Sequence, residues 1–270
     1  MKDAIYRLLG DRTNPAAHVE PAYYTPFQLD FGDGRTPTVV RAPYHPDVGY
    51  LLSALDLHPG SPALFISGGA GFMDEKQKEY TREAVLDGLA KFAADYGVTV
   101  IDGGTQAGVM QLMGEAHRAQ HYSFPLIGVA PVGAIRFSGY DNPDGVPLDP
   151  DHTHFVLVDG EKFGDESDLI VRLASALNAG REARAFGVVI NGGGITTQET
   201  YDRALSPETA LPLLVFDGSG RFGDMLAAAA RGVHQEDARI HTILENVDVR
   251  VVPLDFGPDR VYAELERLLS

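Results

Sequence analysis

The chain of 270 residues contains no cysteine. It therefore has no disulfide, no zinc site made of thiolates and no thiol nucleophile. Basic residues are also few, because 22 lysines and arginines stand against 38 aspartates and glutamates and give a formal net charge of −16. A negative chain repels phosphate backbones and anionic lipid headgroups at long range. We expect neither a nucleic acid nor a membrane surface as a partner.

Long apolar runs are missing as well. No stretch approaches the roughly 20 apolar residues that cross a bilayer, and residues 1–18 lack the apolar core of a secretory signal. We therefore expect a cytoplasmic protein. The length of the chain suits one large α/β domain with a substantial core.

From residue 63 onward, β patterns alternate with helical patterns. Such alternation is typical of a parallel sheet covered by helices on both faces. We predict a Rossmann-like, doubly wound α/β fold with a mostly parallel sheet and an N-terminal extension. Strands are expected at residues 63–67, 98–102, 125–130, 154–158, 186–191, 213–216 and 249–253, and helices at 80–96, 106–119, 166–177, 197–205, 221–230 and 258–269.

The first part of the chain is irregular. Residues 1–26 hold three prolines and a short helical pattern at 4–9, which predicts an arm attached to a ligand-binding domain of residues 27–270. Alternation at 27–31 and a β pattern at 38–40, on either side of a glycine-rich turn, predict a hairpin. A short helix is expected at 47–55.

Three of the expected strands run into glycine clusters that precede a helix. Glycines let the backbone turn tightly, so that its N–H groups and the next helix N-terminus can face an anion. Three such turns on neighbouring parallel strands would line one crevice, at the carboxyl ends of the central strands where the strand order reverses. The candidate ligand-binding residues are Gly68, Gly69, Ala70 and Gly71 in the first turn, Gly103, Gly104, Thr105 and Gly108 in the second, and Gly192, Gly193, Gly194, Thr196 and Thr197 in the third.

The middle turn is the most informative of the three. Thr105 is expected to cap the following helix, while Gly103 and Gly104 expose N–H groups beside the positive helix end. The alternative is that the glycines only allow tight turns and close helix packing. None of the three turns reads Gly-x-Gly-x-x-Gly, and Gly-x-x-x-x-Gly-Lys-Ser/Thr is absent from the chain. Kinase-like and ordinary dehydrogenase chemistry are therefore disfavoured.

A fourth candidate anion site, at 218–223, does read Gly-x-Gly-x-x-Gly. It adds Gly218, Ser219, Gly220 and Arg221 to the ligand-binding candidates. The dinucleotide fingerprint also requires an acidic residue about 20 positions further on, at the end of the next strand; here the next expected strand ends near residue 253. A helix cap explains the run as well, with Ser219 or Asp217 bonding the first N–H groups.

Several motifs together resemble a known family. The segments 65–70, 103–110, 114–116, 152–159 and 217–221 occur in the order and at roughly the spacing of the N-terminal cytoplasmic region of melastatin-type TRP channels. The chain looks like a stand-alone prokaryotic member of the SLOG superfamily, which also includes LOG and Smf/DprA proteins. The resemblance implies recognition of a nucleotide-derived ligand, such as ADP-ribose or an NAD-related nucleotide, because the similar region of such channels can bind ADP-ribose.

The third turn bears on catalysis. Residues 191–199 resemble the Pro-Gly-Gly-x-Gly-Thr-x-x-Glu motif of LOG phosphoribohydrolases, which split the N-glycosidic bond of a nucleoside monophosphate, although Asn191 replaces the proline and Ile195 a glycine. Glu199 falls on that family's acidic residue. With Arg172 it forms the candidate catalytic pair, since such hydrolysis needs a carboxylate at the oxocarbenium-like centre and a cation against the phosphate. Glu199 also fits a glutamate that complements the helix dipole.

Two further features have competing explanations. Arg136 falls near an arginine of the channel region and is a candidate phosphate or adenine contact, but a surface salt bridge explains Arg136 and Arg172 as well. His152 and His154 stand among carboxylates, which suggests a metal. Hydrogen bonding in a turn that leads into a strand explains the same residues, and we predict no metal and no cofactor.

Three hypotheses about function follow from the sequence. The first is a protein that binds or senses a nucleotide-derived ligand. The second is an enzyme that cleaves the N-glycosidic bond of such a nucleotide, and the third is an interaction domain in which the glycines are structural. The LOG resemblance also implies a homodimer.

Overall fold

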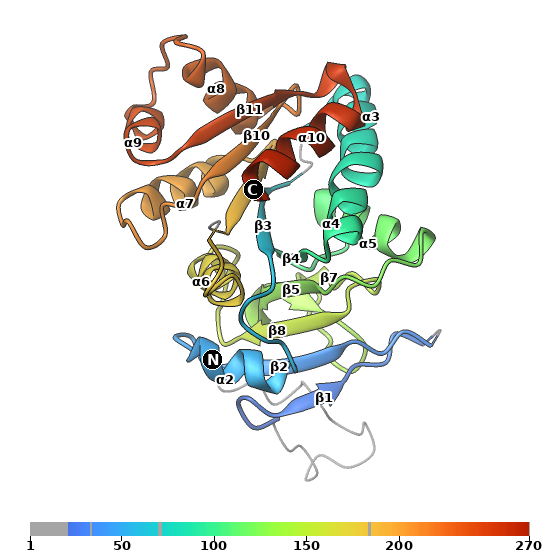
Figure 1. The fold of residues 1–270 in the computed structure, drawn as a ribbon. Helices are drawn as coiled ribbons and strands as arrows, with labels where there is room; N and C mark the ends of the chain where they lie inside the picture. The colour runs from blue at the N-terminus through green and yellow to red at the C-terminus, as the bar shows by residue number, and fades with distance from the viewer. Residues whose placement is uncertain (1–20, 33, 70–71, 183–184, 270) are drawn as a thin grey trace.

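A computed structural model describes residues 21–269, apart from 33, 70–71 and 183–184, and shows an α/β fold (Figure 1). The main sheet has nine strands in the order β1-β2-β8-β5-β4-β3-β9-β10-β11, and helices cover both of its faces. The predicted Rossmann-like, mostly parallel fold is confirmed. The helix expected at 4–9 lies outside the described residues, and the division of the chain at residue 27 stays a prediction.

The strands lie close to their predicted positions. Neighbouring strands from β2 to β11 pair in parallel, while β1 and β2 form the predicted antiparallel hairpin. A small parallel pair, β6 with β7, lies in the connection between β5 and β8. The strands are β1 (Pro26–Gln28), β2 (Thr38–Ala42), β3 (Ala63–Gly68), β4 (Thr99–Asp102), β5 (Leu126–Pro131), β6 (Ile135–Arg136), β7 (Val146–Pro147), β8 (His154–Val158), β9 (Phe186–Ile190), β10 (Leu213–Asp217) and β11 (Val249–Pro253).

The helices form one layer on each face of the sheet. Successive strand residues alternate between the layers, so Phe65 packs in one apolar cluster and Leu64 and Ile66 in the other. One layer consists of α2 (Val48–Ala54), α6 (Ser167–Leu177), α7 (Gly194–Ala204), α8 (Arg221–Ala230) and α9 (Ala238–Asn246). The other consists of α3 (Glu75–Glu83), α4 (Lys91–Tyr96), α5 (Gly108–Ala119) and α10 (Pro258–Leu269).

Two helices differ most from the sequence prediction. The helix expected at 80–96 begins earlier, because Asp74 and Gln77 form a capping box, and a π-helical segment, Ala84–Ala90, separates α3 from α4. Helix α9 was not predicted. Its local signals are weak: Asp237 caps it, and Ile240 and Ile243 are its buried residues.

The strand order reverses between β3 and β9. From β3 the chain adds β4, β5 and β8 in one direction and then returns to place β9 on the opposite side of β3, from which β10 and β11 continue. Loops leaving the carboxyl ends of β3 and β9 therefore diverge and open a crevice between them. The predicted place for a ligand is this switch point.

The two strands at the switch point approach each other very closely at Gly68. A Cβ on Gly68 would lie 1.9 Å from the backbone oxygen of Ile190, and the residue has a φ of +148°. We expect Gly68→Ala to lower the free energy of unfolding by about 1–3 kcal/mol, because the neighbouring backbone cannot move aside. Gly69→Ala is the matched control, since its Cβ would meet nothing within 4 Å. Urea unfolding of both variants tests this; equal stabilities would contradict the close approach.

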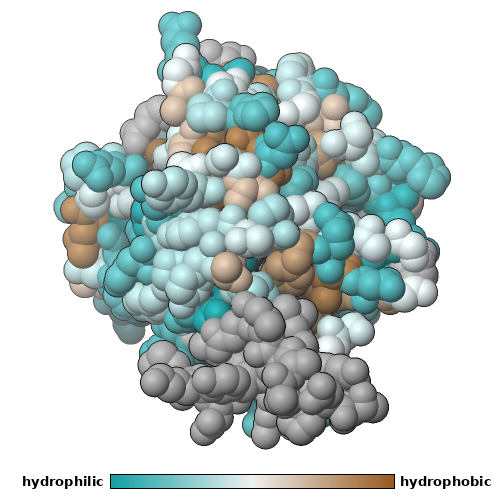
Figure 2. Space-filling view, turned by 90° about the horizontal axis from the view of Figure 1, so that it is seen from below, coloured by the Kyte–Doolittle hydropathy of each residue, from teal (hydrophilic) through white to brown (hydrophobic). Residues whose placement is uncertain are grey.

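The outer surface seen from below the view of Figure 1 is mainly hydrophilic. Hydrophobic residues form small groups there, one of them beside the atoms drawn in grey (Figure 2). Within the described ranges, no helix combines the length and the apolar character that crossing a membrane requires.

Candidate functional site

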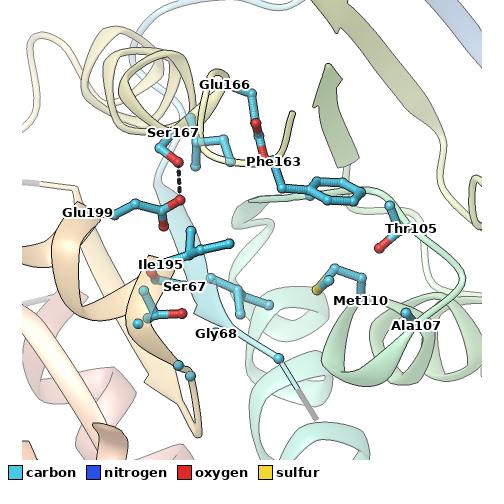
Figure 3. Close-up of a pocket in the computed structure, with 18 of the residues that line it drawn as sticks. Ser67, Gly68, Thr105, Ala107, Met110, Phe163, Glu166, Ser167, Ile195 and Glu199 are labelled. Carbon is cyan, nitrogen blue, oxygen red and sulfur yellow. Dashed lines mark hydrogen bonds between the residues drawn. The ribbon is translucent and has the colours of Figure 1, made fainter. Parts of the chain in front are cut away.

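The three glycine turns line one cavity. It has a volume of about 410 Å³ and lies at the carboxyl ends of β3, β4 and β9, where the strand order reverses. Glu199, Ser167 and Ile195 lie on one side of it and Thr105, Ala107 and Met110 on the other (Figure 3). The sequence therefore placed the crevice correctly, and the turns differ in what each offers a ligand.

The third turn offers a helix N-terminus to the cavity. Asn191 and Gly192 adopt φ values of +56° and +87°, which turn the chain directly into α7. Helix α7 begins at Gly194, three residues earlier than predicted, and no side chain in the described part of the structure caps it. Gly192, Gly193, Gly194 and Thr196 line the cavity. The first N–H groups of a helix have no intrahelical partner, so this terminus is suited to bind an anion.

Arg221 brings a positive charge to the same place. A Cβ built on Gly193 would lie 2.4 Å from Nη2 of Arg221, so the guanidinium lies directly against the third turn. The guanidinium also lies 5.2 Å from the centroid of the Phe72 ring, which is 91% exposed. The sequence assigned Arg221 to the fourth turn, but the residue, at the start of α8, lines this cavity and lies at the third turn.

The first turn contributes Gly68 and Gly69 to the cavity wall. The N–H of Gly69 donates to the backbone oxygen of Ile190 at 3.2 Å, so it is not available to bind an anion. Ala70 and Gly71, the other candidates in this turn, lie outside the described residues. The preceding residue, Ser67, was not predicted: it is 4% exposed, lines the cavity, and its Oγ is buried with no hydrogen-bond partner among the residues described.

The middle turn is less open to an anion than predicted. Gly103 and Thr105 line the cavity, but the N–H of Gly104 donates to Oδ1 of Asp102 at 2.7 Å. Thr105 does not cap α5, because the helix begins at Gly108, two residues later than expected, and Ala107 is its N-cap residue. Gly104 and Gly108 are not among the residues that line the cavity.

A buried network of charged side chains holds Asp102, the residue that accepts from the N–H of Gly104. The ring of His152 is a hydrogen-bond partner of Asp102 at 2.9 Å and of Asp149 at 2.8 Å, and all three residues are at most 3% exposed. Burial disfavours the charged ring, but the two carboxylates outweigh burial and raise the pKa of His152 to about 10. The imidazolium therefore donates both N–H groups. No group of three potential metal ligands occurs among the residues the structure describes.

The fourth turn is filled by its own chain. Oδ1 of Asp224 accepts hydrogen bonds from the N–H groups of Gly218 and Gly220, at 2.8 and 2.9 Å. A carboxylate therefore occupies the position where an anion was expected, and neither Ser219 nor Asp217 caps the helix. Ser219 instead accepts from the N–H of Asn191 and donates to the oxygen of Phe216. None of Gly218, Ser219 and Gly220 lines the cavity.

Two carboxyl groups form the side of the cavity nearest α6. Glu166, which precedes α6, accepts from the N–H of Gly164 at 2.9 Å, and Glu199 on α7 accepts from Oγ of Ser167 at 2.5 Å (Figure 3). Burial raises the pKa of Glu166 from 4.5 to about 7, and the Glu199 carboxylate adds to the increase. Glu166 was missed by the sequence analysis because no motif marks it.

The arginine beside Glu199 is Arg203, not Arg172. Nη2 of Arg203 lies 3.9 Å from Oε2 of Glu199 and donates to the backbone oxygen of Ser167 at 3.2 Å. Arg172 stands five positions after Ser167, which turns it about 140° around α6. It donates instead to the backbone oxygen of Pro46 at 3.0 Å, so the predicted pairing with Glu199 is not formed.

Two other predicted contacts also lie away from the cavity. Arg136 is exposed on β6 and does not line the cavity. Thr197 lies inside α7, where its hydroxyl donates to the oxygen of Gly193 at 3.0 Å. A sequence pattern gives the order of such residues but not the direction in which each side chain points.

The fold and the glycine-lined switch-point cavity define an α/β protein of the Rossmann-like class, and comparison with known proteins identifies its family. Residues 61–263 match the family described as SLOG in TRPM, prokaryote, and the chain belongs to this family. The predicted resemblance is confirmed. Membership supports a nucleotide-related role in general.

The similar curated proteins are transient receptor potential channels. The chain is 30% identical over 228 residues to a TRP channel subfamily M member-like 2 protein of Nematostella vectensis, an alignment that covers 71% of this chain and 14% of the channel. A TRP channel of Caenorhabditis elegans is 26% identical over 85% of this chain and 13% of its own length. TRP channel subfamily M member 2 of Mus musculus is 30% identical over 63% of this chain and 13% of the channel. The chain therefore corresponds to a small part of each relative.

Proposed function

We propose that the protein binds a nucleotide-derived ligand, such as ADP-ribose or an NAD-related nucleotide, in the switch-point cavity. One observation carries the proposal: the uncapped N-terminus of α7 and the Arg221 guanidinium meet at Gly193. A cation beside the positive end of a helix is unfavourable, and an anion between them stabilises both. In a chain of net charge −16, such a site favours a phosphate.

The remaining walls suit the rest of a nucleotide. The volume of about 410 Å³ lies within the range of small-molecule sites, roughly 300–1,000 Å³. Apolar side chains of Ile66, Met110 and Phe163 line the cavity and offer contacts for a base. The family supports the same class of ligand.

Isothermal calorimetry with ADP-ribose, NAD and AMP tests this function. We expect saturable binding of at least one of the three, with one ligand per chain. If none of the three ligands binds saturably, the proposal is wrong and the interaction-domain hypothesis is favoured.

A second candidate function is hydrolysis of an N-glycosidic bond, and it rests on the two cavity carboxyl groups. A protonated acid beside an ionised carboxylate is the arrangement used to protonate a leaving group and to stabilise an oxocarbenium-like centre. Glu166, with its pKa of about 7, fits the acid, and Glu199 fits the carboxylate. Chromatography of base released from AMP or NAD tests it. Hydrolysis is supported if the release of base is lost in Glu199→Gln but kept in the exposed control Glu79→Gln. If the wild type releases no base, hydrolysis is wrong and only the binding function remains.

A further inference from the structure

The polar groups of the cavity are divided between two ends of opposite character. The end at the third glycine turn presents N–H donors and the Arg221 guanidinium. The end at α6 presents the Glu166 and Glu199 carboxyl groups, with the Arg203 guanidinium 3.9 Å from Glu199. Ser67 also lines the cavity, with its buried Oγ lacking a partner among the described residues. A ligand that satisfies both ends must itself be anionic at one place and rich in hydroxyl donors at another.

The acidic end is built before any ligand arrives. Glu166 is only 6% exposed and is held by the N–H of Gly164. Glu199 is held by the Ser167 hydroxyl, and Arg203 lies 3.9 Å from its other oxygen. Side chains that are already fixed lose little conformational entropy on binding, so their remaining lone pairs are ready acceptors.

We propose that Ser67, Glu166 and Glu199 receive the ribose 2′ and 3′ hydroxyls of the bound nucleotide. This inference deepens the proposed function and rests on it. Carboxylates accept hydrogen bonds from hydroxyls and repel phosphate, so the ligand is oriented with its phosphate at Arg221 and its ribose at α6. The buried Ser67 hydroxyl, costly to leave unpaired, gains a partner that either donates or accepts.

The chemistry of the three groups suits a vicinal diol better than a single hydroxyl. Glu199 is an acceptor, whereas burial brings the pKa of Glu166 to about 7, so that Glu166 supplies a donor as well as an acceptor near neutral pH. The Ser67 hydroxyl does both. The site therefore selects ribonucleotides with free 2′ and 3′ hydroxyls over deoxyribonucleotides and over ligands with a ribose phosphate at that position.

The test compares matched ligands by calorimetry. The tightest binder among AMP, NAD and ADP-ribose is measured against analogues that lack one ribose 2′ hydroxyl at a time. In the unaltered protein we expect one analogue to bind about 10-fold to 100-fold more weakly, which is the range for a hydrogen bond to a charged group. In Glu199→Gln and in Ser67→Ala, the ratio between the ribose and deoxyribose ligands is expected to shrink toward one.

Arg221→Met is the matched control for this ratio. It removes a group at the phosphate end, so it should weaken the ribose and deoxyribose ligands equally and leave their ratio unchanged. Equal binding of every ribose and deoxyribose pair, with affinity still dependent on Arg221, would overturn the inference while the proposed function stands. If none of the three parent ligands binds, both are overturned.

Discussion

Replacing His152 by leucine is expected to lower the free energy of unfolding by about 3–5 kcal/mol at neutral pH, as for other buried ion pairs that lose one partner. The ring bonds Asp102 and Asp149, which are 0% and 2% exposed. Leucine leaves two carboxylates buried without their common cation. Urea unfolding followed by circular dichroism measures the loss.

His154→Leu is the matched control, because His154 is a neighbouring, partly buried histidine whose ring is hydrogen-bonded to the Thr153 hydroxyl rather than to a carboxylate. His154→Leu should lower the free energy of unfolding much less than His152→Leu does. The two carboxylates raise the pKa of His152 from 6.5 to about 10. The contribution of His152 to the free energy of unfolding is therefore complete below pH 6.5 and is lost as the pH rises through 10. The loss in His152→Leu should therefore be smaller at pH 9.5 than at pH 7. Equal stabilities of the two variants would contradict the buried ion network.

Glu166→Gln is expected to stabilise the protein above neutral pH. Burial raises the pKa of Glu166 from 4.5 to about 7, so ionising this carboxyl costs stability. The difference between the pKa values of 4.5 and about 7 corresponds to about 3 kcal/mol in the free energy of unfolding, at roughly 1.4 kcal/mol per pKa unit. In the wild type, the contribution of Glu166 to the free energy of unfolding is complete below pH 4.5 and is lost as the pH rises through 7. Glutamine does not titrate, and its side-chain oxygen still accepts from the N–H of Gly164.

Unfolding by urea at pH 4.5 and pH 8 measures this effect. The variant and the wild type should be similar at the lower pH and should differ by up to about 3 kcal/mol at the higher one. The exposed Glu161→Gln serves as the control and should show no such trend. A difference between Glu166→Gln and the wild type that does not change with pH would contradict the burial of an ionisable carboxyl group in the cavity.

Much of the fold could be predicted because the central strands of its sheet are buried on both faces. Strands such as β3 and β9 therefore read as continuous apolar runs, and the glycine clusters mark their carboxyl ends. The shared cavity follows from those positions, whereas the strand order that places the switch point between β3 and β9 was not predicted. The short helix α9 escaped prediction because its nine residues carry only two buried side chains.

The chemistry of the site was less predictable because it depends on the direction of side chains. Asp102 and Asp224 bond the glycine N–H groups that the sequence offered to a phosphate. Arg203, rather than Arg172, reaches Glu199, since the two arginines belong to different helices. Glu166 follows no motif and becomes notable only through its burial beside Glu199.

The central claim is that the N-terminus of α7 and Arg221 together hold the phosphate of a nucleotide. Calorimetric titration of wild type and Arg221→Met with ADP-ribose, NAD and AMP tests it most directly, with Arg231→Met as a control, because Arg231 ends the same helix and pairs with Asp217 instead. We predict that the wild type and Arg231→Met bind alike and that Arg221→Met binds about 10-fold to 100-fold more weakly. Equal affinity of Arg221→Met and the wild type would contradict the claim.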